Sequence, residues 1–126
     1  MSSPATTDAC IPLRDIMVTM ISRIAEIAET LQQDQVDCFL SALLNAERIF
    51  VIGAGRSGFV AKAFAMRLMH LNLTSYVVGE TVTPSFHKED TLIAFSGSGK
   101  TKSVLEACET TRQIGGQICL ITGTKN

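Results

Sequence analysis

The sequence has few charges and no long run of basic or of apolar residues. Charged residues make up 18% of the 126 positions, the formal net charge is −1, and the isoelectric point is near 6.1. A nucleic-acid-binding protein usually carries a basic face, so the lack of a lysine- and arginine-rich run argues against that class. No apolar stretch approaches the roughly 20 residues needed to cross a bilayer. We therefore expect no nucleic-acid or membrane partner.

Closely spaced cysteines and a secretory leader pattern are also missing. The four cysteines, at positions 10, 38, 108 and 119, show no C-x-x-C spacing, so we expect reduced thiols that pack as small apolar side chains. The opening MSSPATTDAC has no basic segment followed by an apolar core, which is the pattern of a signal peptide. These features predict a cytoplasmic location.

Apolar residues, at 46% of the chain, are sufficient for one buried core. In the first third they recur at helical spacing, which predicts a helix over 12–31 and a second over 34–46 capped by Asp34. The period then changes. Runs typical of buried strands occupy 48–52, 75–78, 91–95 and 117–122, and helices are predicted over 57–71 and 101–114. This alternation predicts an α/β, doubly wound parallel sheet preceded by an N-terminal helical pair. We expect a single domain over 1–126, with helices in 1–46 and the α/β core in 47–126.

Two glycine-rich motifs suggest nucleotides. AFSGSGKT (94–101) fits the loose P-loop pattern, but Ala94 and Phe95 belong to a predicted strand, which leaves too short a loop to cradle a nucleotide. GAGRSG (53–58) fits the dinucleotide fingerprint, with Glu80 placed as a ribose-binding acid. Arg56 and Ser57 fill that turn, however, where close backbone approach is the usual purpose. An oxidoreductase that binds a dinucleotide remains an alternative.

Both loops are better explained together as a site for a small phosphorylated ligand. Each follows a buried strand and opens a helix, so each offers free N–H groups at a positive helix terminus. Because the carboxyl ends of parallel strands meet at one edge of a sheet, the loops should converge there. We predict that Arg56 and Ser57 contact the sugar. The predicted phosphate-binding residues are Ser96, Gly97, Ser98, Gly99, Lys100 and Thr101.

Four stretches carry a resemblance to a known family: VIGAGRSGFVAKAFAMRLMHL, SYVVGETVTPSF, LIAFSGSGKTKSV and ICLITGTKN. They resemble the sugar isomerase (SIS) domain, and more narrowly the 6-phospho-3-hexuloisomerase family of the ribulose monophosphate pathway, a route of formaldehyde assimilation. The resemblance implies interconversion of 3-hexulose 6-phosphate and fructose 6-phosphate without a metal or nucleotide cofactor, by a homotetramer. The nearly all-apolar helix 57–71 independently predicts a subunit interface.

The chain also departs from that family, whose members continue through a fifth strand. The glutamate that the family uses as its base lies in that further part, so no position here matches it. Within this chain Glu80 is the candidate carboxylate, whereas His70 and His87 are expected to be structural or solvated. We expect the chain to be truncated before the fifth strand and to be inactive alone. A non-catalytic sugar-phosphate sensor is a further alternative, because SIS domains also occur in transcription regulators.

Overall fold

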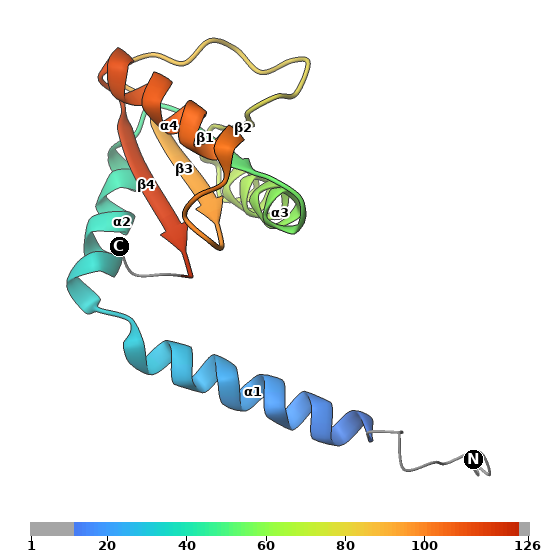
Figure 1. The fold of residues 1–126 in the computed structure, drawn as a ribbon. Helices are drawn as coiled ribbons and strands as arrows, with labels where there is room; N and C mark the ends of the chain where they lie inside the picture. Colours follow the sequence, from blue (N-terminus) through green and yellow to red (C-terminus); the bar gives the residue numbers. More distant parts are fainter. Residues whose placement is uncertain (1–11, 124–126) are drawn as a thin grey trace. The chain divides into compact units, whose positions relative to one another are not determined.

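Two helices open the described part of the chain, which comprises residues 12–123 of the computed structural model (Figure 1). They are α1 (Leu13–Thr30) and α2 (Gln33–Asn45), and both match the predicted helices. Asp34 lies inside the first turn of α2 rather than at its cap, and its carboxylate accepts a hydrogen bond of 2.9 Å from the Gln35 N–H. No helix within residues 12–123 is long and apolar enough to cross a membrane.

The chain forms two compact units, Met1–Val36 and Asp37–Asn126. The boundary falls within α2, ten residues before the predicted start of the α/β core at position 47. The later part of α2 belongs to the α/β unit, where Leu43 joins the buried core and Phe39 lies 6.3 Å from Phe64, measured between ring centroids.

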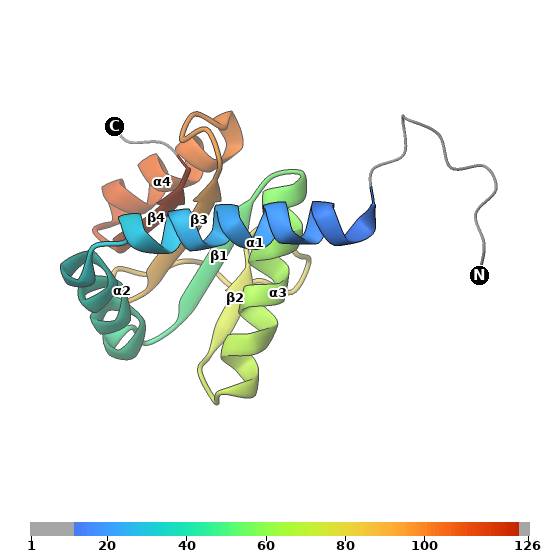
Figure 2. The same ribbon diagram turned by 90° about the horizontal axis from the view of Figure 1, so that it is seen from below.

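A four-stranded parallel sheet forms the centre of the second unit, and its strand order is β2-β1-β3-β4 (Figure 2). Its strands are β1 (Ile49–Gly53), β2 (Ser75–Val77), β3 (Thr91–Ser96) and β4 (Gln117–Thr122). The remaining helices are α3 (Arg56–His70), which follows β1, and α4 (Lys102–Ile114), which follows β3. The predicted alternation of strands and helices is confirmed, as is the end of α4 at Gly115, which adopts a left-handed conformation.

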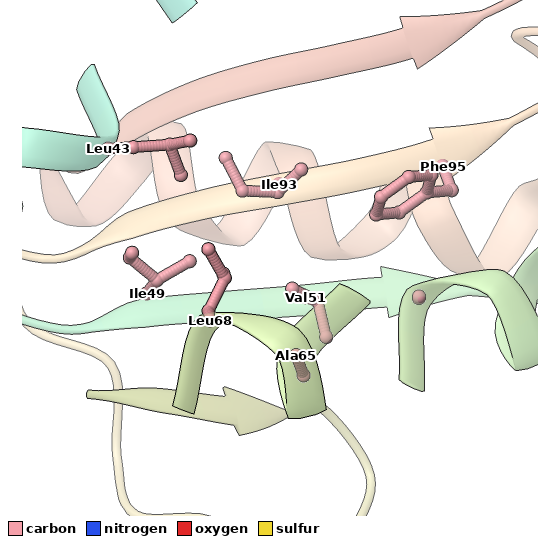
Figure 3. Close-up of a cluster of buried hydrophobic side chains, with 8 residues drawn as sticks. Leu43, Ile49, Val51, Ala65, Leu68, Ile93 and Phe95 are labelled. Atoms are coloured by element: carbon pink, nitrogen blue, oxygen red, sulfur yellow. The ribbon is translucent and has the colours of Figure 1, made fainter. Parts of the chain in front are cut away.

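Alternate residues of the central strands pack against helices on opposite faces of the sheet. On one face, Ile49 and Val51 of β1 and Ile93 of β3 meet α3 and the later part of α2 (Figure 3). On the other face lie α4 and Phe50, whose ring is 5.1 Å from that of Phe86 between centroids. All of β3 is buried, so its continuous apolar run reflects burial on both faces.

The segment from Gly79 to Asp90 connects β2 to β3 without regular secondary structure, and a buried ion pair anchors its end. Arg48 precedes β1 and donates to both carboxylate oxygens of Asp90, from Nε at 3.0 Å and from Nη2 at 2.6 Å. Arg48 also donates to the Ser85 carbonyl oxygen, and the His87 N–H donates to Asp90 at 2.8 Å. The side chain of Asp90 is only 1% exposed, so this network fixes the return of the chain into β3.

The environment of Asp90 favours its charged form. Burial by itself would raise the pKa of Asp90, but the hydrogen bonds from Arg48 and from the His87 N–H, together with the Arg48 charge, outweigh it. The pKa of Asp90 therefore lies below its ordinary value of 3.8. Arg48 is held further by the ring of Phe50, whose centroid lies 5.2 Å from the guanidinium carbon.

Candidate functional site

The two glycine-rich loops leave the same edge of the sheet side by side. Gly53 at the end of β1 pairs in register with Phe95 of β3, so the β1–α3 turn and the β3–α4 loop start next to each other. The chain continues from β1 toward β2 on one side and returns to β3 on the other side. This β1/β3 position is the topological switch point of the sheet, where α/β proteins commonly bind ligands.

The glycines of the β1–α3 turn serve close packing at two positions and an open turn at the third. A Cβ on Gly53 would lie 2.5 Å from the Ser57 carbonyl oxygen, and one on Gly58 would lie 2.9 Å from the Gly53 carbonyl oxygen. Gly53 and Gly58 therefore bring strand and helix together. Gly55 has φ 58° and ψ −129°, a conformation that favours glycine, and a Cβ there would meet nothing within 4 Å. The turn is thus open above Gly55.

Arg56 and Ser57 begin α3 beside that open turn. Arg56 is exposed and Ser57 is half-buried. Within the part of the chain that the structure describes, Arg56 takes part in no ion pair. Its guanidinium is therefore available to an anionic or hydroxyl-rich ligand at the switch point.

The β3–α4 loop is shaped by its own hydroxyl groups. Ser96, the last residue of β3, is 2% exposed, and its Oγ lies 2.8 Å from the Oγ1 of Thr101 and accepts a 3.0 Å hydrogen bond from the Gly99 N–H. Gly99 has φ 73°, a conformation that favours glycine. From outside the loop, the Gly123 N–H donates to the Gly97 carbonyl oxygen at 3.2 Å. Ser96 and Thr101 thus close a compact loop, which is shorter than a P-loop.

The rest of this loop faces outward at the start of α4. Gly97, Ser98 and Lys100 are exposed, and the Lys100 N–H donates to the Ser98 Oγ at 3.1 Å. Thr101 makes no side-chain hydrogen bond that caps α4, since its hydroxyl is engaged with Ser96. An uncapped helix N-terminus beside exposed glycine and serine residues is a favourable place for an anion such as phosphate.

A third element at this edge is the turn that follows β2. The Glu80 N–H and the Thr83 hydroxyl both donate to the Val77 carbonyl oxygen, and the Thr83 N–H donates to the Glu80 carbonyl oxygen at 3.1 Å. Gly79 has φ 96°, so glycine allows the chain to enter this turn. The turn presents Glu80 3.6 Å from Lys62 of α3, measured from Oε1 to Nζ.

Lys62 and Thr83 were not singled out from the sequence. Lys62 lies one helical turn after Gly58, so the spacing places both on one face of α3. That spacing was the available signal. The other predicted candidates lie apart from these residues: His70 is exposed in the last turn of α3, and the backbone of His87 serves the Asp90 network.

No set of three histidine, cysteine, aspartate or glutamate side chains within residues 12–123 is arranged to hold a metal ion. Cys38, Cys108 and Cys119 are free thiols, and burial raises the pKa of Cys108 and of Cys119. A raised pKa leaves little thiolate at neutral pH, so neither is an activated nucleophile. Cys10 lies outside the described residues.

The fold and the loops define a class of protein: a doubly wound parallel sheet with an open, serine- and glycine-rich loop at its switch point. Residues 42–126 match the family described as the SIS domain, and the chain belongs to that family. The resemblance seen in the sequence is thereby confirmed.

Similar proteins extend over most of the chain. A protein of Methanocaldococcus jannaschii named 3-hexulose-6-phosphate isomerase is 46% identical over 89 residues, which cover 71% of this chain and 49% of the relative. A protein of Mycobacterium gastri with the same name is 40% identical over 99 residues, which cover 79% and 50%. A solved structure of a hypothetical protein superposes with a TM-score of 0.86 at 42% identity, covering 90% of this chain and 61% of that one. The chain spans about half the length of the curated relatives it matches.

Proposed function

We propose that this chain is the phosphosugar-binding part of a cytoplasmic sugar-phosphate isomerase that interconverts 3-hexulose 6-phosphate and fructose 6-phosphate. The observation that carries the proposal is the switch-point arrangement, in which an exposed anion-binding loop lies beside an open turn bearing Arg56. The names of the relatives from Methanocaldococcus jannaschii and Mycobacterium gastri support the same activity.

In this proposal the β3–α4 loop holds the phosphate group. Ser98 and the N–H groups at the start of α4 supply hydrogen bonds, while Ser96 and Thr101 keep the loop in the required shape. Gly97 lets the phosphate approach the backbone, because a Cβ there would meet nothing within 4 Å and the space is open. Lys100 adds a positive charge at the edge. Binding energy from this remote group orients the reacting carbons.

The reaction itself is a proton transfer along the sugar. A base removes the proton from C2, the electron pair forms a double bond between C2 and C3, and the C3 carbonyl oxygen becomes an oxyanion. A proton moves from O2 to O3, the base returns its proton to C3, and the carbonyl is then at C2. A carboxylate serves as the base, and Arg56 with Ser57 would stabilise the developing oxyanion.

The base is expected outside the residues that form these loops. The family resemblance implies a glutamate beyond Asn126, so we propose that residues 1–126 alone bind phosphosugar with little turnover. Loss of a positioned general base typically costs about 10²–10⁴-fold in rate. Glu80 is the carboxylate of this chain at the same sheet edge.

We also propose a homotetramer. The outer side of α3 exposes Phe59 at 72%, Val60 at 55%, Met66 at 54% and Met69 at 56% of their surfaces. A helix that is apolar on both sides is normally covered, and a second subunit would cover this side.

The test is a ligand comparison followed by an assay. Calorimetry should detect binding of fructose 6-phosphate and no binding of ATP or NAD to the chain. An assay should detect isomerisation by a version lengthened to the size of the relatives, and a large loss of rate when its downstream glutamate becomes glutamine. Preferred binding of NAD would instead indicate a dinucleotide-dependent oxidoreductase. Binding of phosphosugar without turnover in the lengthened version would indicate a sensor.

A further inference from the structure

A small cavity opens at the sheet edge on the other side of β1 from the phosphate-binding loop. Its volume is about 250 Å³, and it lies between the carboxyl ends of β1 and β2 and the first turns of α3. Gly53 and Gly58 form one wall, the backbone of residues 77–79 forms another, and Lys62 and Glu80 border the cavity. The wall at Gly53 is the back of the same turn that carries Arg56.

The two charged groups of this cavity attract one another without using up their hydrogen-bonding capacity. The Lys62 Nζ and the Glu80 Oε1 are 3.6 Å apart, which is longer than a hydrogen bond. The ammonium keeps its donors and the carboxylate keeps its acceptor sites. A sugar hydroxyl both donates and accepts, so a cation and an anion bordering one cavity suit a hydroxyl-rich ligand.

Stability does not account for this pair. The side chains are 55% and 48% exposed, and ion pairs this exposed contribute little to folding. The turn that presents Glu80 is nevertheless closely determined, because the Thr83 hydroxyl and two backbone N–H groups hold it and Gly79 takes a left-handed conformation. An ordered turn thus holds a carboxylate beside a cavity where its ion pair does little for the fold.

We infer that Lys62 and Glu80 form a sugar-binding subsite, in which they bind hydroxyl groups of the phosphosugar whose phosphate lies on the β3–α4 loop. This inference rests on the proposed function. Gly53 borders the cavity and pairs with Phe95, the residue before Ser96, so one strand spacing of about 4.8 Å separates the two regions at that level. An open-chain six-carbon sugar is longer than that spacing, so one ligand can reach both. Lys62 and Glu80 are then specificity-determining residues for the sugar.

The experiment separates the sugar from the phosphate. Titration calorimetry measures the affinity of the chain and of the variants Lys62→Met and Glu80→Gln for fructose 6-phosphate and for inorganic phosphate. Because each variant removes a hydrogen bond to a charged group, we expect each to weaken fructose 6-phosphate binding by about tenfold or more. Inorganic phosphate does not reach the cavity, so its affinity should stay within about twofold of the parent value.

The ion pair between Arg112 and Glu109 on α4 provides the matched control. It is also exposed, at 74% and 52%, so Arg112→Met and Glu109→Gln make the same charge changes elsewhere. They should alter neither affinity. Equal loss of both ligands in the cavity variants, or no loss of either, would overturn the subsite while leaving the proposed function intact. If the unmodified chain bound phosphate but showed no preference for fructose 6-phosphate, the proposed function would fail along with the subsite.

Discussion

The two ends of the sheet use charged residues in opposite ways. At the amino end, Asp90 has a side chain only 1% exposed, and its carboxylate receives hydrogen bonds from Arg48 and from a backbone N–H. At the carboxyl end, Lys62 and Glu80 are about half exposed and 3.6 Å apart. The same chemical groups are therefore saturated by the protein at one end and left with spare bonding capacity at the other.

This difference separates stability from recognition. A buried carboxylate must be fully paired, because an uncompensated buried charge is costly. An exposed, loosely paired carboxylate costs the fold little and can accept hydrogen bonds from a ligand. If the comparison is right, substitutions at the amino end change stability and spare binding, whereas substitutions at the carboxyl end do the reverse.

The largest expected effect is on stability, at Asp90. The change Asp90→Ala breaks a largely buried pair and leaves the His87 N–H without its acceptor. Breaking such a pair typically costs about 3–5 kcal/mol of unfolding free energy. Urea unfolding measures it. Glu109→Ala, at the exposed pair on α4, is the control and should cost less than about 0.5 kcal/mol. A loss at Asp90 as small as that of the control would show that this end of the sheet is not the stabilising one.

The next effect is on binding, at Ser98. The change Ser98→Ala removes a hydrogen bond to the phosphate and should weaken fructose 6-phosphate binding by about 1.5–3 kcal/mol. Stability should hardly change, because Ser98 is exposed. The control is Thr19→Ala on α1, which also removes an exposed hydroxyl that is hydrogen-bonded to the backbone, to the Asp15 carbonyl oxygen. Unchanged affinity in a folded Ser98 variant would remove this serine from the phosphate site.

A smaller effect should appear on acidification. Because the folded-state pKa of Asp90 is lowered, its ionisation stabilises the protein above its ordinary pKa of 3.8, and that contribution is lost as the pH falls through the folded value. The stability difference between the parent and Asp90→Asn should thus narrow between about pH 6 and about pH 3. Urea midpoints at both pH values provide the measurement. A constant difference would mean that charge is not what Asp90 contributes.

The sequence alone predicted the elements well because buried parallel strands need continuous apolar runs. The run RIFVI and the run TLIAF each became a strand, and the glycines after them became turns. The same reasoning rejected the P-loop, since Ala94 and Phe95 do lie in β3. Local signals of this kind depend on neighbouring residues in the chain and are readable without a structure.

The pairings that distinguish the two ends could not be predicted in the same way. Arg48 and Asp90 are 42 residues apart, and Lys62 and Glu80 lie on a helix and a separate turn. Their meeting depends on the strand order, which no local pattern states. The glycines show the same limit, because Gly53 is required by a neighbouring carbonyl whereas Gly97 faces open space, although both stand in glycine-rich motifs.

That contrast between glycines gives the smallest expected effect on stability. A Cβ on Gly97 would meet nothing within 4 Å, and its φ lies outside the left-handed range, so Gly97→Ala should fit without strain. Alanine also restricts the unfolded chain, which can raise stability by about 0.4–1 kcal/mol. We expect thermal unfolding unchanged or slightly raised. Fructose 6-phosphate binding should nonetheless weaken, because the new methyl group occupies space that the phosphate needs. The control is Gly115→Ala at the end of α4, where φ is 95°: it should lower stability and leave the affinity of the folded protein unchanged. If Gly97→Ala bound fructose 6-phosphate as tightly as the parent, the open space above this loop would not be where the phosphate lies.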